Sequence, residues 1–137
     1  MGPFVIDASM TLAWAMPDET DTSARAIHER AADFHAHAPS IWLLEVANAF
    51  LMAERRKRIS RQQRMRMLAE LENLGVAVDH EAMFSAWSTL ADLAAANKIT
   101  IYDAAYLELA TRLQLPLATR DRELAKAARS AHIEVLS

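Results

Sequence analysis

Four acidic side chains stand next to apolar runs, at points where the sequence turns from strand or loop toward helix. They are Asp7 in FVIDAS, Glu45 in WLLEVANAF, Asp103 in TIYDAAYLELA and Asp121 in LATRDREL. Folding could bring all four to one edge of a sheet, where their oxygen atoms would suit a hard cation such as Mg²⁺ or Mn²⁺. Such a cation offsets the negative charge of a phosphodiester and lowers the pKa of a bound water. The four acids together therefore predict a divalent-metal site suited to phosphodiester hydrolysis.

Each of these acids also has a structural interpretation. Asp7 or Asp121 could cap a helix through its carboxylate, and Glu45 could complement a helix dipole. Asp103 could be the third residue of a capping box that Thr100 opens. Taken one at a time, cap preferences favour these structural roles, whereas the occurrence of all four acids beside apolar runs favours a shared site.

Five polar side chains near the acids could complete the site. They are Ser9, Asn48, Thr119, Arg120 and Arg122. The two hydroxyl groups could orient the neighbouring carboxylates, although Ser and Thr are also common helix caps. Asn48 lies one helical turn beyond an acid and could hydrogen-bond within the pocket, or it could be a partly exposed helix residue. The two arginines flank an acid and could contact a substrate phosphate.

The secondary structure expected from periodicity and capping alternates between strands and helices. Strands are predicted at 4–6, 76–78, 116–119 and 133–136, with an extended segment at 35–39 that crosses the sheet or its edge. Helices are predicted at 10–16, 19–34, from Ser40 to about 53, 60–74, 81–97, 103–114 and 121–129. This alternation predicts an α/β fold with a mostly parallel central sheet flanked by helices. Ligands of such sheets bind beyond the carboxyl ends of the strands, which is where Asp7 and Asp121 would lie.

Composition limits the class of protein. The chain has 137 residues, of which 53% are hydrophobic, and this favours one domain over residues 1–137. The net charge of −3 identifies neither nucleic acid nor membrane as the partner. With no Cys and with His residues that lack metal-binding helical spacing, the acids suit Mg²⁺ or Mn²⁺ better than zinc. No signal peptide or membrane-spanning run is evident, so we expect a cytoplasmic protein.

Four sequence blocks resemble the PIN-domain ribonucleases of the VapC toxin type. The blocks are Val5 to Ser9, Glu45 to Phe50, Tyr102 to Ala110 and Ala118 to Asp121, and their order and spacing match across almost the whole chain. The resemblance implies a PIN-like fold and an endoribonuclease toxin that hydrolyses RNA with Mg²⁺, for which Mn²⁺ substitutes. It also implies neutralisation by a cognate VapB-type antitoxin and assembly as a homodimer, either alone or within a larger toxin-antitoxin complex.

The resemblance implies roles for the acids as well. Asp7 and Asp103 are the expected direct metal ligands, and Asp121 and Glu45 complete the cluster through the metal, its waters or a second ion. One-metal and two-metal mechanisms both stay open, as do the RNA that is cut and the cleavage site.

Other interpretations of the chain stay open too. A PIN nuclease could act in RNA processing or on structured DNA without being a toxin, and an inactive PIN-like domain could serve as a binding module. A receiver-like domain is disfavoured because the expected acid pair after the first strand and the late Lys are not evident.

Two further groups of residues have alternative interpretations. The basic run from Arg55 to Arg66 could follow an RNA backbone or could be a solvated surface. The aromatic and Met side chains are predicted to lie mainly in the core, although some could line an oligomer or antitoxin interface. They are Trp14, Trp42, Trp87, Met10, Met16 and Met52.

Overall fold

A computed structural model describes residues 2–137 and contains one five-stranded sheet. The strands are β1 (Phe4–Ile6), β2 (Ala36–Pro39), β3 (Ala77–Asp79), β4 (Leu117–Ala118) and β5 (Val135–Leu136). They lie in the order β3-β2-β1-β4-β5, and every pairing in this sheet is parallel. The predicted α/β fold with a mostly parallel sheet is confirmed.

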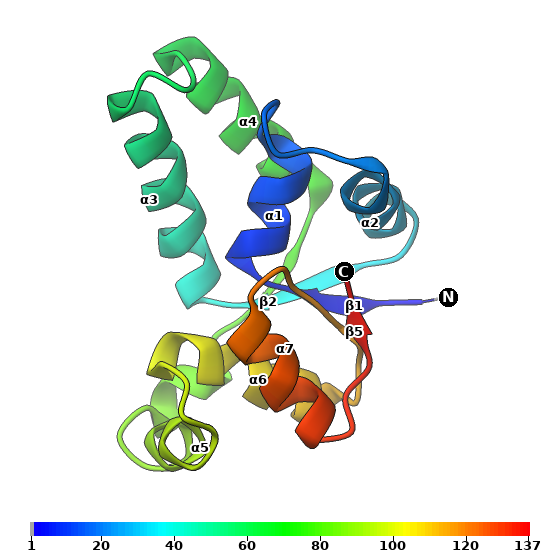
Figure 1. Ribbon diagram of the computed structural model, residues 1–137, viewed down its shortest axis with the longest axis vertical. Coiled ribbons are helices and arrows are strands. Elements are labelled where there is room, and N and C mark those ends of the chain that lie inside the picture. Colours follow the sequence, from blue (N-terminus) through cyan, green and yellow to red (C-terminus); the bar gives the residue numbers. More distant parts are fainter. Residues whose placement is uncertain (1) are drawn as a thin grey trace.

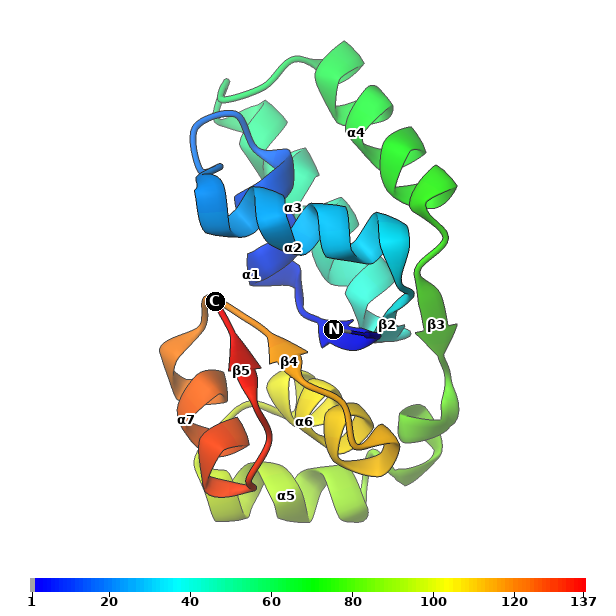
Figure 2. The same cartoon turned by 90° about the vertical axis from the view of Figure 1, so that its right-hand side faces the viewer.

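Seven α-helices and one 3₁₀ helix are formed within the described residues. They are α1 (Ala8–Ala15), α2 (Thr22–Asp33), α3 (Ile41–Arg55), α4 (Arg61–Leu74), the 3₁₀ helix η1 (Glu81–Ser85), α5 (Thr89–Asn97), α6 (Ile101–Leu113) and α7 (Arg122–Ser130). Helices α1 to α4 lie on one side of the sheet and α5 to α7 on the other, as both views show (Figures 1 and 2). None of the helices in residues 2–137 has the length and apolarity needed to cross a bilayer.

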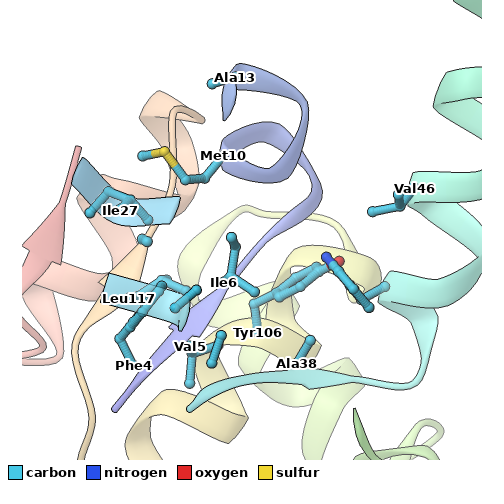
Figure 3. Close-up of a cluster of buried hydrophobic side chains, with 14 of the residues drawn as sticks. Phe4, Val5, Ile6, Met10, Ala13, Ile27, Ala38, Val46, Tyr106 and Leu117 are labelled. Atoms are coloured by element: carbon cyan, nitrogen blue, oxygen red, sulfur yellow. The ribbon is translucent and has the colours of Figure 1, made fainter. Parts of the chain in front are cut away.

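The central strand β1 is buried on both faces. Phe4, Val5 and Ile6 have no exposed surface, as expected for a strand of a parallel sheet that is covered by helices on each side. Met10 from α1 and Leu117 from β4 belong to the same apolar core (Figure 3). Because all three side chains of β1 are packed in the core, the position of Asp7, which follows the strand, is well defined.

Most predicted elements are confirmed with boundaries shifted by a few residues. The extended segment at 35–39 contains β2, which is an interior strand between β1 and β3. Ser60 caps α4 in a full capping box with Gln63, and Gly75 ends this helix at φ 72°, in the left-handed region where glycine is favoured.

The predicted continuous helix over 81–97 is wrong. The segment forms η1, then a turn, then α5, and Ser88 adopts a backbone conformation (φ −125°, ψ −94°) that no helix accepts. A hydroxyl group in the segment bonds to a nearby carbonyl: Ser85 donates to Ala82 O at 3.2 Å. Such local hydrogen bonds compete with the backbone hydrogen bonds of a continuous helix.

The prediction that Trp87 is a core residue is also wrong. Its side chain is 98% exposed on the turn between η1 and α5, and Phe84 is 90% exposed three residues earlier. Trp42, Met10 and Met16 are buried as predicted, while Trp14 packs partly buried against the core.

Candidate active site

Asp7 follows β1 directly and begins α1. Its carboxylate Oδ1 accepts a hydrogen bond from the Met10 backbone N–H at 2.9 Å, so the predicted capping role is confirmed. The Ser9 hydroxyl donates to both carboxylate oxygens at 2.7 and 2.9 Å. Only 4% of Asp7 is exposed, although it carries a carboxylate. The carboxylate is therefore held in one orientation at the carboxyl end of the central strand.

The segment after β4 closes over Asp7 from the neighbouring strand. The Thr119 hydroxyl donates to Asp7 Oδ2, and the Asp121 backbone N–H donates to Thr119 Oγ1 at 3.0 Å. Asp121 also caps α7, because its Oδ1 accepts from Leu124 N–H at 2.9 Å. Two acids that are far apart in sequence thus meet at one sheet edge because β1 and β4 are paired in parallel.

Glu45 and Asp103 approach the same edge from helices α3 and α6. Asp103 stands in the first turn of α6, where its backbone N–H donates to the Thr100 cap at 3.0 Å. One turn further on, the buried Tyr106 hydroxyl donates to Glu45 Oε1. Since this bond links α6 on one side of the sheet to α3 on the other, it fixes Glu45 relative to the strand edge.

Burial and neighbouring charges raise the pKa of two of the four acids, Asp7 and Asp103. Burial, together with the charges of Asp121, Asp7 and Glu45, raises the pKa of Asp103 to about 6. Burial also raises the pKa of Asp7 to about 6, although hydrogen bonds from Thr119, Met10 and Ser9 oppose the shift. The pKa of Tyr106 is raised by burial and by its bond to Glu45, so this phenol stays protonated as a donor. Without a cation the cluster therefore resists full ionisation.

The donor set suits a hard divalent cation, because it consists of carboxylates with no Cys or His among them. As the side chains stand, no three acidic or His residues between positions 2 and 137 lie close enough together to hold one ion. Asp7 Oδ1 accepts from Met10 N–H and Ser9, and Oδ2 accepts from Thr119 and Ser9, so a cation at Asp7 would have to share an oxygen with one of these donors or displace it. Holding one ion with several of these acids would therefore require their side chains to rearrange.

The predicted neighbours differ in where they lie. Ser9 and Thr119 contact Asp7 directly, and the Arg120 backbone N–H donates to Ser9 Oγ at 2.8 Å. Arg122 is exposed in the first turn of α7. Asn48 is exposed on α3 and is one turn from Glu45, as its spacing predicted.

Sequence reasoning missed two residues at this edge. Tyr106 lies three positions after Asp103, and this helical spacing is a signal that could have revealed it. The other is Asp21, whose carboxylate binds the guanidinium of Arg120 although the two residues are 99 positions apart. Local sequence carries no signal for that contact.

The basic run lies at the opposite end of α3 from the acids, where the loop between α3 and α4 projects away from the sheet (Figure 1). Arg55 stands ten residues after Glu45, which corresponds to about 15 Å along the helix. Arg58 is bound to Asp18 and Glu19, and Arg64 to Glu54. Part of this basic charge is therefore already neutralised within the chain.

The fold and the site define a class: an α/β domain with a cluster of carboxylates at the carboxyl edge of a parallel sheet. The family model described as "PIN domain" matches residues 4–130. The chain is also 30% identical over 122 residues to "Ribonuclease VapC3" of Pyrobaculum aerophilum, a match that spans 89% of this chain and 92% of the relative. The chain belongs to the PIN-domain family, and the family expectation from the sequence is confirmed.

A solved structure supports the fold. It is the crystal structure of PAE2754 from Pyrobaculum aerophilum, which is similar with a TM-score of 0.68 and 22% sequence identity. The match covers 92% of this chain and 84% of that chain.

Proposed function

We propose that the protein is a metal-dependent endoribonuclease toxin of the VapC type, with its catalytic site at Asp7, Glu45, Asp103 and Asp121. The observation that carries the proposal is the approach of Asp7, Glu45 and Asp121 to Asp103 at the carboxyl ends of the strands, where burial and these three charges raise the pKa of Asp103. A relative that spans most of the chain is named a ribonuclease, which supports RNA as the substrate.

The residues of the proposed site would have two roles, holding the metal ion and orienting the carboxylates that hold it. A bound Mg²⁺ or Mn²⁺ would supply charge neutralisation at the phosphate and a water of lowered pKa. Asp7 and Asp103 would hold the cation, with Asp121 and Glu45 completing the cluster. Ser9 and Thr119 orient Asp7 through their hydroxyl groups, and Tyr106 orients Glu45. Four carboxylates with no bound cation repel a phosphodiester, so substrate binding and metal binding should be coupled.

The proposal is tested with partner-free protein and a mixed cellular RNA pool, with Mg²⁺, Mn²⁺ or EDTA. Asp7→Asn is compared with Asp92→Asn, which removes an exposed carboxylate from α5. We expect discrete products from the wild type and from Asp92→Asn, with metal only, and none from Asp7→Asn. Equal cleavage by Asp7→Asn would point to a contaminating nuclease and would remove the acidic site from the proposal.

A groove beside the site suits the proposed antitoxin. It has a volume of about 490 Å³ between α3, α4 and β3, and its lining is mainly apolar, including Trp42, Leu43, Val46, Met65 and Leu68. Val46, which lines the groove, directly follows Glu45, so a peptide held in the groove would lie close to one of the four acids. We expect a VapB-type antitoxin to anchor apolar side chains there. Leu68→Asp should weaken its binding without a comparable loss of RNA cleavage, as measured by calorimetry with purified antitoxin.

The exposed aromatic surface suits the proposed homodimer. It comprises Leu44, Phe84, Trp87, Ile101 and Tyr102, which lie on elements that join around a second small core. Buried aromatic side chains contribute about 150–250 Å² each, so this surface approaches the roughly 800 Å² per partner of a stable interface. Trp87→Ser combined with Phe84→Ser should give a monomer by sedimentation, whereas an unchanged dimer would place the interface elsewhere.

A further inference from the structure

We propose that Arg120 is a ligand for an RNA phosphate and that Asp21 occupies the phosphate position until the substrate displaces it. The inference rests on the proposed ribonuclease function and adds to it a residue from the start of α2. Asp21 would then limit RNA binding through competition, and the α1–α2 connection would take part in substrate entry.

The contact between the two side chains is bidentate. Arg120 Nη1 donates to Asp21 Oδ2 and Nη2 donates to Oδ1, both at 2.9 Å. Arginine binds carboxylate and phosphate with the same parallel pair of hydrogen bonds. The carboxylate of Asp21 therefore has the geometry that a phosphate oxygen pair would adopt on the same guanidinium.

The backbone of Arg120 is fixed relative to the acidic cluster. Its N–H donates to Ser9 Oγ at 2.8 Å, and the same hydroxyl donates to Asp7. Arg120 also stands between Thr119, which binds Asp7, and Asp121. Rotation of the side chain alone would move the guanidinium between Asp21 and a phosphate, while the strand edge stays in place.

The exposure of the ion pair makes this exchange easy. The side chains of Arg120 and Asp21 are 31% and 50% exposed, and exposed pairs of this kind contribute little to stability. An incoming phosphate with its own charge can therefore compete with the carboxylate. A buried pair would not exchange in this way, because breaking it would leave an uncompensated charge out of water.

The chain offers a closely matched control. Arg58 also binds Asp18 through two hydrogen bonds, from Nε at 3.0 Å and from Nη2 at 2.9 Å, with side-chain exposures of 34% and 55%, and it binds Glu19 in addition. Asp18→Asn and Asp21→Asn therefore remove the same charge from similar exposed pairs on one connection of the chain. Asp21 also caps α2 through Ala24 N–H, and this role survives in Asp21→Asn because Asn is an equally good cap.

The experiment measures binding of a short fluorescently labelled RNA of mixed sequence by anisotropy over a series of salt concentrations. Ca²⁺ replaces Mg²⁺ so that the acids keep a cation, and electrophoresis after each measurement verifies that the RNA is intact. The proteins are the wild type, Asp21→Asn, Asp18→Asn, Arg120→Gln and the double variant Asp21→Asn/Arg120→Gln. Relative to Asp18→Asn, we expect Asp21→Asn to bind about two- to fivefold more tightly. Its logarithmic salt dependence should steepen by about 0.7, the value for one additional phosphate contact on a single strand. Adding Arg120→Gln should abolish both gains.

The inference is overturned if Asp21→Asn and Asp18→Asn bind alike, or if the gain persists without Arg120. Cleavage of the RNA pool with metal separates this failure from that of the proposed function. If the wild type cleaves RNA while the two Asn variants bind alike, only the role of Asp21 is wrong. If the wild type neither cleaves nor binds RNA, both proposals fail.

Discussion

Helix α6 contributes to two groups of carboxylates, of which one is paired with an arginine and the other has no basic partner within residues 2–137. At its carboxyl end, Arg112 binds Glu108, Asp79 and Glu81 at distances between 2.7 and 3.0 Å. At its amino end, Asp103 joins Asp7, Asp121 and Glu45, and within residues 2–137 none of these four forms an ion pair with a basic side chain. The hydrogen bonds from Arg112 hold the pKa of Asp79 below its usual range, whereas burial raises the pKa of Asp103 to about 6.

The difference indicates that stability alone does not explain the acidic edge, the group formed by Asp7, Glu45, Asp103 and Asp121. Arg112, on the same helix as Asp103, neutralises three carboxylates. The absence of a basic side chain beside Asp103 is therefore not a general property of the fold. Uncompensated, partly buried carboxylates reduce stability and are concentrated at functional sites. A divalent cation would supply at the amino end of α6 the compensation that Arg112 supplies at the other end.

The largest expected effect separates the two groups by activity. Asp103→Asn should lower RNA cleavage by about a hundredfold or more. Loss of a carboxylate that holds the cation would remove several kcal/mol of the transition-state stabilisation that the cation supplies. Asp79→Asn removes the same charge from the arginine-bound group and should leave the rate within a few fold of the wild type. Initial rates on labelled RNA with Mn²⁺ measure both. Comparable losses in the two variants would show that the groups do not differ in function.

The second prediction concerns stabilisation by metal. At a Mn²⁺ concentration of 100 times the dissociation constant, binding to the folded state alone should add about 2.7 kcal/mol to the free energy of unfolding. For a chain of this size the corresponding rise in Tm is about 10 °C. Asp79→Asn should keep the rise, and Asp7→Asn combined with Asp103→Asn should lose it. A melting curve of the wild type that does not move at high Mn²⁺ would contradict a metal site at the acidic edge.

The third prediction is a pH dependence of opposite sign for the two groups. Burial raises the pKa of Asp7 from 3.8 to about 6, so between these values the folded state binds more protons than the unfolded state. Without metal, the free energy of unfolding should therefore fall by up to about 3 kcal/mol as pH rises from about 4 to 6 and stay level above that. Asp103 contributes in the same direction. Asp79, whose pKa is lowered by Arg112, contributes stability that is lost only as pH falls below about 4.

Urea midpoints in EDTA across this range test the sign. Asp7→Asn should flatten the decrease between pH 4 and 6, while Asp79→Asn should leave it and weaken the loss below pH 4. A wild type whose stability increases from pH 4 to 6 would show that the carboxylates of the acidic edge are compensated in solution.

Local and long-range features of the molecule differ in how far sequence predicts them. The capping roles of Asp7 and Asp121 depend on the three residues that follow each acid, so they were predictable and are confirmed. The parallel sheet followed from alternating periodicities. The contact of Asp21 with Arg120 and that of Tyr106 with Glu45 join residues 99 and 61 positions apart, and no local pattern encodes them.

The segment 81–97 shows the converse error. Its Ala and Leu content favours helix throughout, but the turn at Ser88 interrupts the segment and leaves Trp87 exposed. Helix propensity describes a chain segment by itself and carries no information on where the segment must turn or which side chains the folded chain leaves exposed. The same limit applies to the acids, since proximity of carboxylates is unfavourable until a cation is present.

The smallest expected effect comes from Arg112→Met, which removes the cation but keeps much of the apolar stem. The side chains of Arg112, Asp79 and Glu108 are 27%, 24% and 17% exposed, so water screens their charges only in part. We expect a loss of about 1–2 kcal/mol in the free energy of unfolding, between the values for exposed and buried pairs. The loss should shrink in the double variant Arg112→Met/Asp79→Asn, because that variant relieves the repulsion among the remaining carboxylates. If Arg112→Met instead gave the protein a new Mn²⁺-dependent rise in stability, three carboxylates without a cation would suffice to make a metal site in this fold. The position of the acids at the strand ends would then matter less than the absence of an arginine.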